Sequence, residues 1–129
     1  MKTLPKVFVG VDVSKKHLDV CVYPEEKTFR ITNNEDGFKK MTDEMSKYFV
    51  EIITCEASGG YERAMAKYVA KRGFKKWIVD PKRIKHFIIA EGIQYKTDKN
   101  DARMIALFAS KAERRYDQRE KTDNENILG

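Results

Sequence analysis

The chain has few metal-binding side chains of the kinds that zinc prefers. Its 129 residues include two cysteines and two histidines. Cys21 and Cys55 each lie inside an apolar run, and neither has a second cysteine or a histidine at the spacing of a zinc site. We therefore expect two buried, reduced thiols of a cytoplasmic protein and no zinc centre.

Long apolar runs are also missing. No segment approaches the roughly 18 apolar residues that a membrane-spanning helix needs. The beginning of the chain, MKTLPKVFVGVDVSKK, has only a short apolar run with an aspartate in it, which does not fit a secretory signal peptide. We find no internal repeat and no low-complexity tract, so we expect one domain and no membrane partner.

Charge, in contrast, is abundant and unbalanced. Lys and Arg number 26 against 20 for Asp and Glu, which gives a net charge of +6 and a pI near 9.3. This excess favours an anionic partner such as nucleic acid. The chain is 41% hydrophobic, which is enough apolar material for one core.

The beginning of the chain alternates between apolar and polar residues, as strands do. The runs KVFVGVDVS, HLDVCVYP and KTFRIT have this pattern, and the links between them are short. We expect three consecutive strands, paired antiparallel. The first has apolar residues on both of its faces, which is typical of a central strand.

From Asn34 onward the period becomes helical in two places. A helix that begins at Asn34 is followed by a strand that ends at Glu56. A second helix, closed by Gly73, comes next, and after it a further strand and a short helix that begins at Pro81. The order βββαβαβα plus one further helix predicts an α/β fold, with a mixed five-stranded sheet flanked by helices. The expected apolar faces are Phe38, Met41, Met45, Tyr48 and Phe49 on the first helix, and Tyr61, Met65, Tyr68 and Val69 on the second.

The last helix aims two acids along its apolar stripe. Asp98 and Asp101 continue the stripe of Ile105, Phe108 and Ala112 at about 100° per residue. One interpretation is a helix cap, with Asp98 at the N-cap and Asp101 in the first turn. The other interpretation is that the pair binds a cation, for which Mg²⁺ is the candidate. After residue 113 the chain turns polar, so we expect a domain over 1–113 and a linker or frayed helix over 114–129.

Two more acids occupy unusual places. Asp12 lies inside a strand among Val and Gly, where an unpaired carboxylate costs several kcal/mol. Glu56 ends a strand just before Ser58-Gly59-Gly60, a position where α/β folds place ligands. An ion pair of Asp12 with Lys15 and a plain surface glutamate are the simpler explanations. If all four acids converge, they would repel one another unless cations such as two Mg²⁺ ions are bound.

Four segments together resemble a known family. VGVDVSKKHLDVCV, TCEASGGYE, WIVDPKRIKHF and YKTDKNDARMIALFA resemble the amino-terminal domain of the DEDD insertion-sequence transposases labelled one-ten, or the Piv-MooV family. The resemblance implies an RNase H-like (RuvC-like) fold. It also implies that the catalytic and metal-ligating acids are Asp12, Glu56, Asp98 and Asp101.

The family's known properties set further expectations. The resemblance implies a metal-dependent polynucleotidyl transferase that uses Mg²⁺ or Mn²⁺, with two ions, to cleave and rejoin DNA near the nucleoid. It also implies a homo-oligomer in the full-length protein and, in some members, a structured guide RNA. Family members carry a carboxyl-terminal domain with a serine nucleophile. This chain does not extend to that domain, so we expect it to be inactive in complete transposition by itself.

Basic side chains near the acids are candidate phosphate contacts. The alternative for each is a solvated surface charge. Tyr61 and Trp77 are candidates to stack on bases, although core packing is the favoured interpretation for both. The candidate nucleic-acid-binding residues are Lys15, Lys82, Arg83, Lys85, Lys96 and Lys99.

Two other functions fit part of the sequence. GVDVSKKHLDV also resembles the first phosphate-binding turn of actin-like ATPases and sugar kinases, but the second lobe is lacking and KTDKND has no role there. A non-catalytic nucleic-acid-binding or assembly module with the same fold is the stronger alternative.

Overall fold

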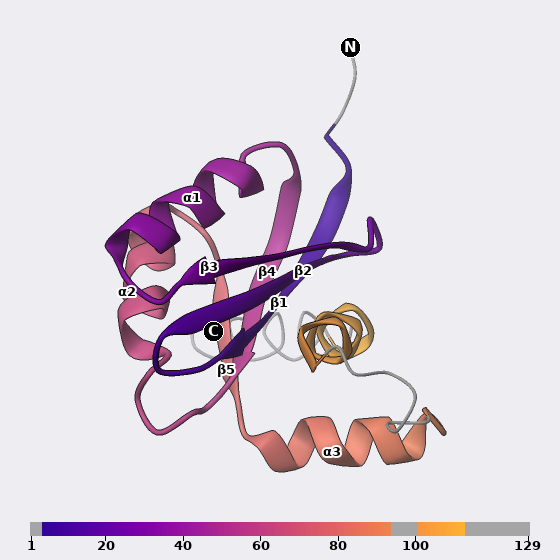
Figure 1. Cartoon of the computed structure of the whole chain (residues 1–129). Coiled ribbons are helices and arrows are strands. Elements are labelled where there is room, and N and C mark those ends of the chain that lie inside the picture. The colour runs from indigo at the N-terminus through magenta and orange to yellow at the C-terminus, as the bar shows by residue number, and fades with distance from the viewer. Residues whose placement is uncertain (1–3, 94–100, 113–129) are drawn as a thin grey trace, which may run out of the picture.

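A computed structural model describes residues 4–93 and 101–112 of the chain. Its strands are β1 (Lys6–Val13), β2 (His17–Tyr23), β3 (Lys27–Thr32), β4 (Phe49–Glu56) and β5 (Lys76–Val79). Its helices are α1 (Glu35–Met45), α2 (Arg63–Lys71) and α3 (Pro81–Ala90), followed by an unlabelled helix over 101–112 (Figure 1). The predicted order βββαβαβα with one further helix is confirmed.

The five strands form one mixed sheet in the order β3-β2-β1-β4-β5. The first three pair antiparallel, and β1–β4 and β4–β5 pair parallel. Strand β1 therefore lies at the centre of the sheet, as its two apolar faces predict. This is the RNase H-like arrangement that the resemblance implies.

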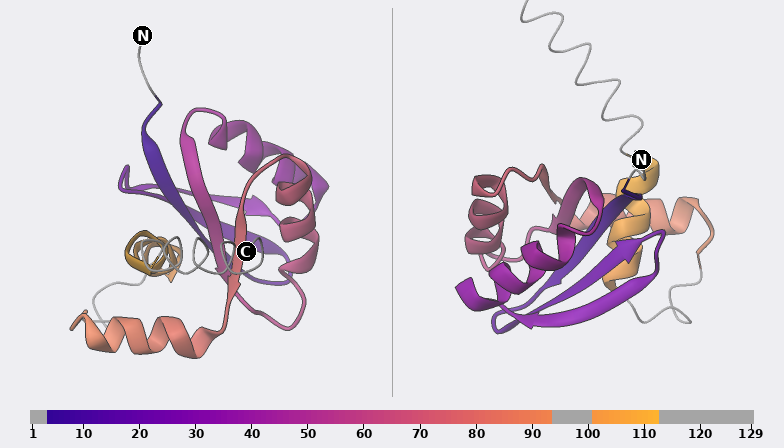
Figure 2. Two further views of the ribbon diagram at one scale, coloured as in Figure 1. Left: turned by 180° about the vertical axis from the view of Figure 1, so that it is seen from behind. Right: turned by 90° about the horizontal axis from the view of Figure 1, so that it is seen from above.

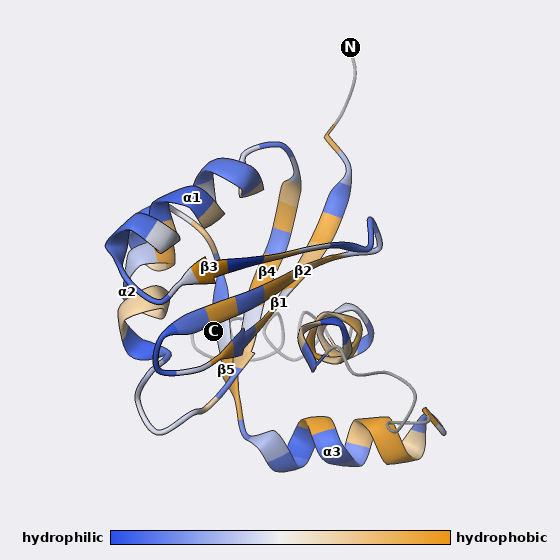
Figure 3. Cartoon of the chain, in the orientation of Figure 1, coloured by the Kyte–Doolittle hydropathy of each residue, from blue (hydrophilic) through white to orange (hydrophobic). Residues whose placement is uncertain are grey.

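Helices cover both faces of the sheet. On one face, which we call the α1/α2 face, Val7, Val9 and Val11 of β1 pack with α1 and α2 in the largest core cluster. On the other face, which we call the 101–112 face, Ala102 and Ala106 pack on Cys21, and a neighbouring cluster joins the helix to α3 and β5. Figure 2 shows the two helix layers on opposite sides of the strands. Figure 3 colours the same cartoon by hydropathy and shows hydrophobic stretches along the strands.

Local signals explain where the helices begin and end. Asn34 caps α1 by accepting a hydrogen bond from the Gly37 amide, and Asp80 caps α3 in the same way through the Lys82 amide. Pro81 occupies the first turn of α3. Gly73, with φ of 90°, follows the end of α2, where a left-handed residue is needed.

Two predicted helix faces extend too far. Helix α1 stops at Met45, and Phe49 instead begins β4 with 58% of its surface exposed. Helix α2 begins only at Arg63, which leaves Tyr61 in the preceding turn, 49% exposed. The assignments of Tyr48, Phe49 and Tyr61 to helical apolar faces, and of Tyr61 to the core, are therefore wrong. Tyr48 packs against the main cluster from the segment after α1. Helical spacing continued by chance beyond the true helix ends in both cases.

The remaining apolar predictions hold. Trp77 is half-buried and packs with Phe108, with ring centroids 5.2 Å apart, so its assignment to the core is confirmed. Cys21 and Cys55 are buried thiols that form no disulfide. Burial, followed by the nearby charges of Glu62 and Glu56, raises the pKa of the Cys55 thiol to about 12. Cys55 is thus a structural side chain that stays protonated at neutral pH.

Candidate active site

Charged side chains form one row across the sheet where β1 and β4 end. The register pairs Asp12 with Asp19 of β2, and Asp19 with Arg30 of β3. On the other side of β1, Val11 is paired with Cys55, which places Asp12 next to Glu56. Because side chains alternate along a strand, the acids of this row share the face opposite to Val11. That face is the 101–112 face.

The helix over 101–112 reaches this row because β1 has no side chain at Gly10. A Cβ at Gly10 would lie 2.2 Å from the Ala102 carbonyl oxygen and 2.4 Å from the Ala106 amide nitrogen. The helix backbone therefore rests directly on β1, two residues before Asp12. Asp101 begins this helix, next to Ala102, and is half-buried. The close contact at Gly10 brings the start of the helix to the end of the strand that carries Asp12.

The electrostatics of Asp12 report its neighbours. Burial raises its pKa above the usual value, and the negative charges of Asp101 and Asp19 raise it further. Arg30 acts in the opposite direction and lowers it. Because such effects fall off with distance, Asp101 must lie within electrostatic range of Asp12.

Glu56 behaves in the same way. Burial raises its pKa, and the charges of Asp12 and Asp101 add to that rise. Three acids from two neighbouring strands and one helix therefore interact with one another. They are drawn from the set that the sequence singles out, and their carboxylate oxygens are ligands that Mg²⁺ accepts.

The rest of the predicted acid set needs two qualifications. Asp98 lies outside the described residues, as do Lys96 and Lys99. Within 4–93 and 101–112, no group of three or more His, Cys, Asp or Glu side chains is arranged so that it could hold a metal ion. The three described acids thus have suitable chemistry and mutual repulsion, but not a closed set of ligands.

Asp19 is an acid of the row that the sequence did not single out. Arg30 grips it with two hydrogen bonds, from Nε to Oδ1 at 2.8 Å and from Nη2 to Oδ2 at 3.1 Å. The alternation of HLDVCVY already places Asp19 on the side opposite to Leu18 and Val20. Its position beside Asp12 depends on the β1–β2 register, which the short SKK turn specifies.

Asn33 ties together the segments that follow the two strands. Its side-chain amide donates to the carbonyl oxygen of Ser14, at 2.9 Å, and to that of Tyr61, at 3.0 Å. Ser14 follows Asp12 by two residues, and Tyr61 lies in the turn between Glu56 and α2. One side chain thus joins the segment that follows Asp12 to the turn that follows Glu56.

The turn after Glu56 is held from within. The carboxylate of the buried Glu62 accepts hydrogen bonds from the Ser58 amide, at 3.3 Å, and from its hydroxyl, at 3.2 Å. Burial raises the pKa of Glu62, but the hydrogen bonds from its own and the Ser58 backbone and from the Ser58 hydroxyl outweigh it, and the pKa is lowered. Glu62 is therefore a structural acid of this turn.

All the candidate basic residues that the structure describes are exposed, and one of them also stacks on aromatic rings. Lys15 lies exposed in the turn after β1, and Lys82 and Lys85 are exposed on α3. The Arg83 guanidinium lies 5.3 Å from the centre of the Trp77 ring and 5.9 Å from that of Phe108. The Arg83 side chain thus makes cation–π contacts with the cluster between α3 and the helix over 101–112. No local pattern in the sequence predicts that stacking.

Comparison with known proteins adds two findings. A family model described as "Transposase", that of the DEDD transposases of IS110, matches residues 9–127. The chain is also similar to the "Pilin gene-inverting protein" of Moraxella lacunata and to that of Moraxella bovis. Each is 30% identical over 114 residues, which cover 84% of this chain and 35% of the relative. The chain thus spans about a third of the length of the curated relatives it matches.

Proposed function

The chain belongs to the DEDD transposase family of IS110, and from this premise we propose that it carries the metal-dependent catalytic site of a DNA transposase or site-specific recombinase. The proposed reaction is phosphodiester cleavage and strand transfer on DNA, in the cytoplasm near the nucleoid. Because the match covers 35% of each relative, complete recombination is proposed to need parts that correspond to the rest of those proteins. A structured guide RNA and a homo-oligomer belong to that larger assembly.

The observation that supports this proposal is the mutual repulsion of three carboxylates. Asp12 and Glu56 lie side by side on β1 and β4, and Asp101 raises the pKa of both. A fold that keeps like charges together against such a cost commonly uses them on a cation. The proposed ligands are Asp12, Glu56 and Asp101, together with Asp98, and the proposed ions are two Mg²⁺ or Mn²⁺.

When bound, such ions activate the attacking oxygen and stabilise the leaving oxygen of a phosphodiester. The chain's own part is to fix the oxygen ligands. Asp12 is held by its pairing with Asp19 of β2, and Glu56 by its pairing with Val79 of β5. Asn33 joins the segments that follow β1 and β4. Lys15, Lys82 and Lys85 are proposed to contact phosphates of the bound strand, a role also proposed for Lys96 and Lys99.

A non-catalytic nucleic-acid-binding module is the second candidate. It is favoured by the lack of a closed group of three metal ligands within the described ranges. Under this candidate the acids would be remnants, and divalent cations would neither stabilise the chain nor support cleavage.

The test measures cleavage of DNA and thermal stability with Mn²⁺ and with a chelator. We expect Mn²⁺ to raise the melting temperature of the wild-type chain, by mass action on a folded-state site. Asp12→Asn should lose that rise and should lower any cleavage by about a hundredfold or more, since even outer-shell changes at metal sites cost 10- to 100-fold.

The matched control is Asp36→Asn, which removes an exposed acid from the first turn of α1. It should keep both the response to Mn²⁺ and the cleavage. A wild-type chain whose melting temperature ignores Mn²⁺, and which cleaves no better than Asp12→Asn, would favour the non-catalytic module.

A further inference from the structure

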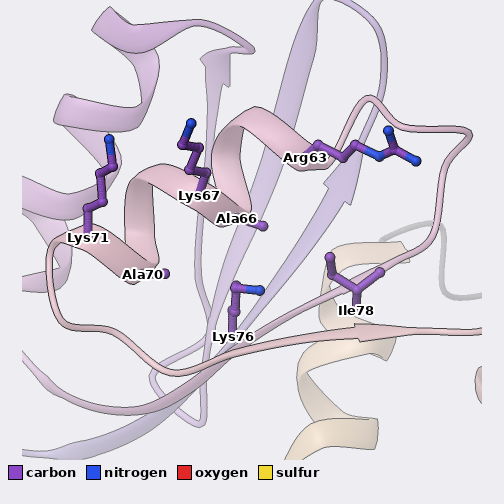
Figure 4. A pocket seen from close by; sticks show the side chains of 7 residues that line it. All are labelled: Arg63, Ala66, Lys67, Ala70, Lys71, Lys76 and Ile78. Carbon is purple, nitrogen blue, oxygen red and sulfur yellow. The ribbon is translucent and has the colours of Figure 1, made fainter.

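An open groove lies between α2 and β5, on the α1/α2 face of the sheet. It has a volume of about 490 Å³ and is lined by Arg63, Ala66, Lys67, Ala70, Lys71, Lys76 and Ile78. In Figure 4, Ala66 and Ala70 of α2 lie toward Lys76 and Ile78 of β5, and the Lys67 and Lys71 side chains extend from α2 away from β5. Four of the seven lining residues are cationic and none is acidic, so the groove is electropositive.

The cations form a regular row. Arg63, Lys67 and Lys71 follow one another at a spacing of four residues, so they share one side of α2 and are separated by about 6 Å each along its axis. The row is thus about 12 Å long. One strand of a DNA duplex advances about 3.4 Å per phosphate, so the row matches about three or four consecutive phosphates.

These cations are exposed and have no ion-pair partner among the described residues. All four basic residues are solvent-exposed, and in the described parts of the chain none of them forms an ion pair. Arg72, the neighbouring cation at the end of α2, differs because it pairs with Asp43 of α1 at 3.6 Å. The groove cations are therefore available to an anionic ligand without the loss of an existing partner.

The groove begins at the same end of the sheet as the candidate active site but on its opposite face, because Lys76 and Ile78 are the strand partners of Ile53 and Cys55, whereas the acids lie on the 101–112 face. Helix α2 follows the turn that comes after Glu56, so Arg63 lies near the end of β4. Ile78 immediately precedes Val79, the strand partner of Glu56. Lys71 and Lys76 lie at the opposite end, where α2 ends and β5 begins. The groove therefore leads away from the edge of the sheet that carries the acids.

We propose that this groove binds the sugar–phosphate backbone of the DNA on which the acids act, on the face of the sheet opposite to the acids. The proposal rests on the proposed function, because it takes DNA to be the substrate. The apolar floor of Ala66, Ala70 and Ile78 makes room for deoxyribose, while the row of cations contacts the phosphates. Such contacts position the strand and do not read its sequence.

The experiment measures binding of a short fluorescent DNA duplex to the wild-type chain and to the double variant Lys67→Gln/Lys71→Gln, as salt rises from about 50 to 200 mM. Each lost phosphate contact should make the slope of log K against log salt shallower by about 0.9, or about 1.8 for the pair. At the lower salt, affinity should fall by about tenfold or more.

The matched control is Lys39→Gln/Lys40→Gln, which removes two exposed lysines from α1 and the same net charge. It should leave the slope nearly unchanged. Lys67→Arg/Lys71→Arg should restore both affinity and slope, and all variants should melt near the wild-type temperature because the altered side chains are exposed.

Equal losses of affinity in the two Gln double variants would contradict the proposal, because binding would then depend only on the net charge of the chain. No binding by the wild-type chain at low salt would overturn it as well. The same experiment is done with single-stranded RNA of equal length. If Lys67→Gln/Lys71→Gln loses much more affinity for that RNA than for the duplex, the groove binds RNA and the DNA proposal is wrong. Failure here is separable from failure of the catalytic proposal, since Asp12→Asn should keep groove-dependent binding while it loses the response to Mn²⁺.

Discussion

The two faces of the sheet are built on different principles. The α1/α2 face is an apolar core in which Val9, Val11 and Ile53 are sealed beneath two helices. The 101–112 face presents Gly10, Thr54 and the acids at the ends of the same strands, beneath a helix whose backbone touches β1. The first face thus gains stability from burial. At β1 the second face gives up side-chain packing to bring a helix close to charged groups, and the same helix buries its apolar residues against α3 and β5.

Adding an atom to the 101–112 face should have the largest effect. Gly10→Ala places a Cβ within 2.4 Å of two backbone atoms of the helix, and backbone cannot move aside as a flexible side chain can. We expect a loss of at least about 3 kcal/mol in the free energy of unfolding, the upper end for overpacking. Hydrogen exchange should show loss of protection in 101–112 while α1 and α2 stay protected. A loss below about 1 kcal/mol would contradict the close contact.

Removing atoms should be the damaging change on the α1/α2 face. Ile53 is 1% exposed within the main cluster, so Ile53→Ala should lower the free energy of unfolding by about 3 kcal/mol through lost burial and a cavity. Denaturant unfolding measures this loss. Ile89→Ala, at a residue that is 66% exposed on α3, is the matched control and should change stability by less than about 0.5 kcal/mol. Similar losses at both positions would undo the distinction between buried and exposed sites.

Thr54 tests whether the 101–112 face carries a polar cost beneath its helix. It is fully buried, and its hydroxyl oxygen has no hydrogen-bond partner among the described residues. Thr54→Val keeps the shape and removes the unsatisfied group, so it should raise the free energy of unfolding by about 1 kcal/mol. A destabilised Thr54→Val would show that the hydroxyl has a partner in solution.

The smallest expected effect is a pH dependence at the rim of the α1/α2 face. Hydrogen bonds from Lys27 of β3 and then Lys47 lower the pKa of Glu44 on α1. A lowered folded-state pKa gives stability that is present above the unfolded value, near 4.3, and lost as the pH falls through the folded value. Glu44→Gln should therefore melt about 1–2 °C lower than wild type at pH 7, and the difference should vanish at acidic pH. A difference that grows as the pH falls would have the wrong sign.

The sequence predicts the strands and the order of elements well because each depends on local pattern. Alternation is visible in β1 to β3, and Asn34 and Pro81 are local signals of helix starts. Helical spacing alone does not mark where a helix begins or ends. It therefore assigns Phe49 and Tyr61 to helices, although α1 ends at Met45 and α2 begins at Arg63.

The candidate site is only partly a matter of local pattern. Asp12 and Asp101 stand out in the sequence because they occupy places expected to be apolar, and Glu56 stands out because it ends a strand just before a glycine-rich turn. Asp19 does not, since its neighbour is set by the pairing of two strands. Gly10 gives no hint of which helix it admits. The groove needs the whole sheet, because Lys76 joins the row of α2 only when β5 is added to β4.

Strand β5 also affects how readily two molecules could pair through the edges of their sheets. It is four residues long and forms one edge of the sheet, and it begins with an exposed lysine. Edge strands offer unpaired amides and carbonyls to other chains, and shortness and lysine are two ways in which proteins discourage such pairing. The opposite edge, β3, carries Lys27 and Arg30. A second molecule that approached either edge would bring its own excess of positive charge, so the surface suited to a polyanion also opposes edge-to-edge aggregation.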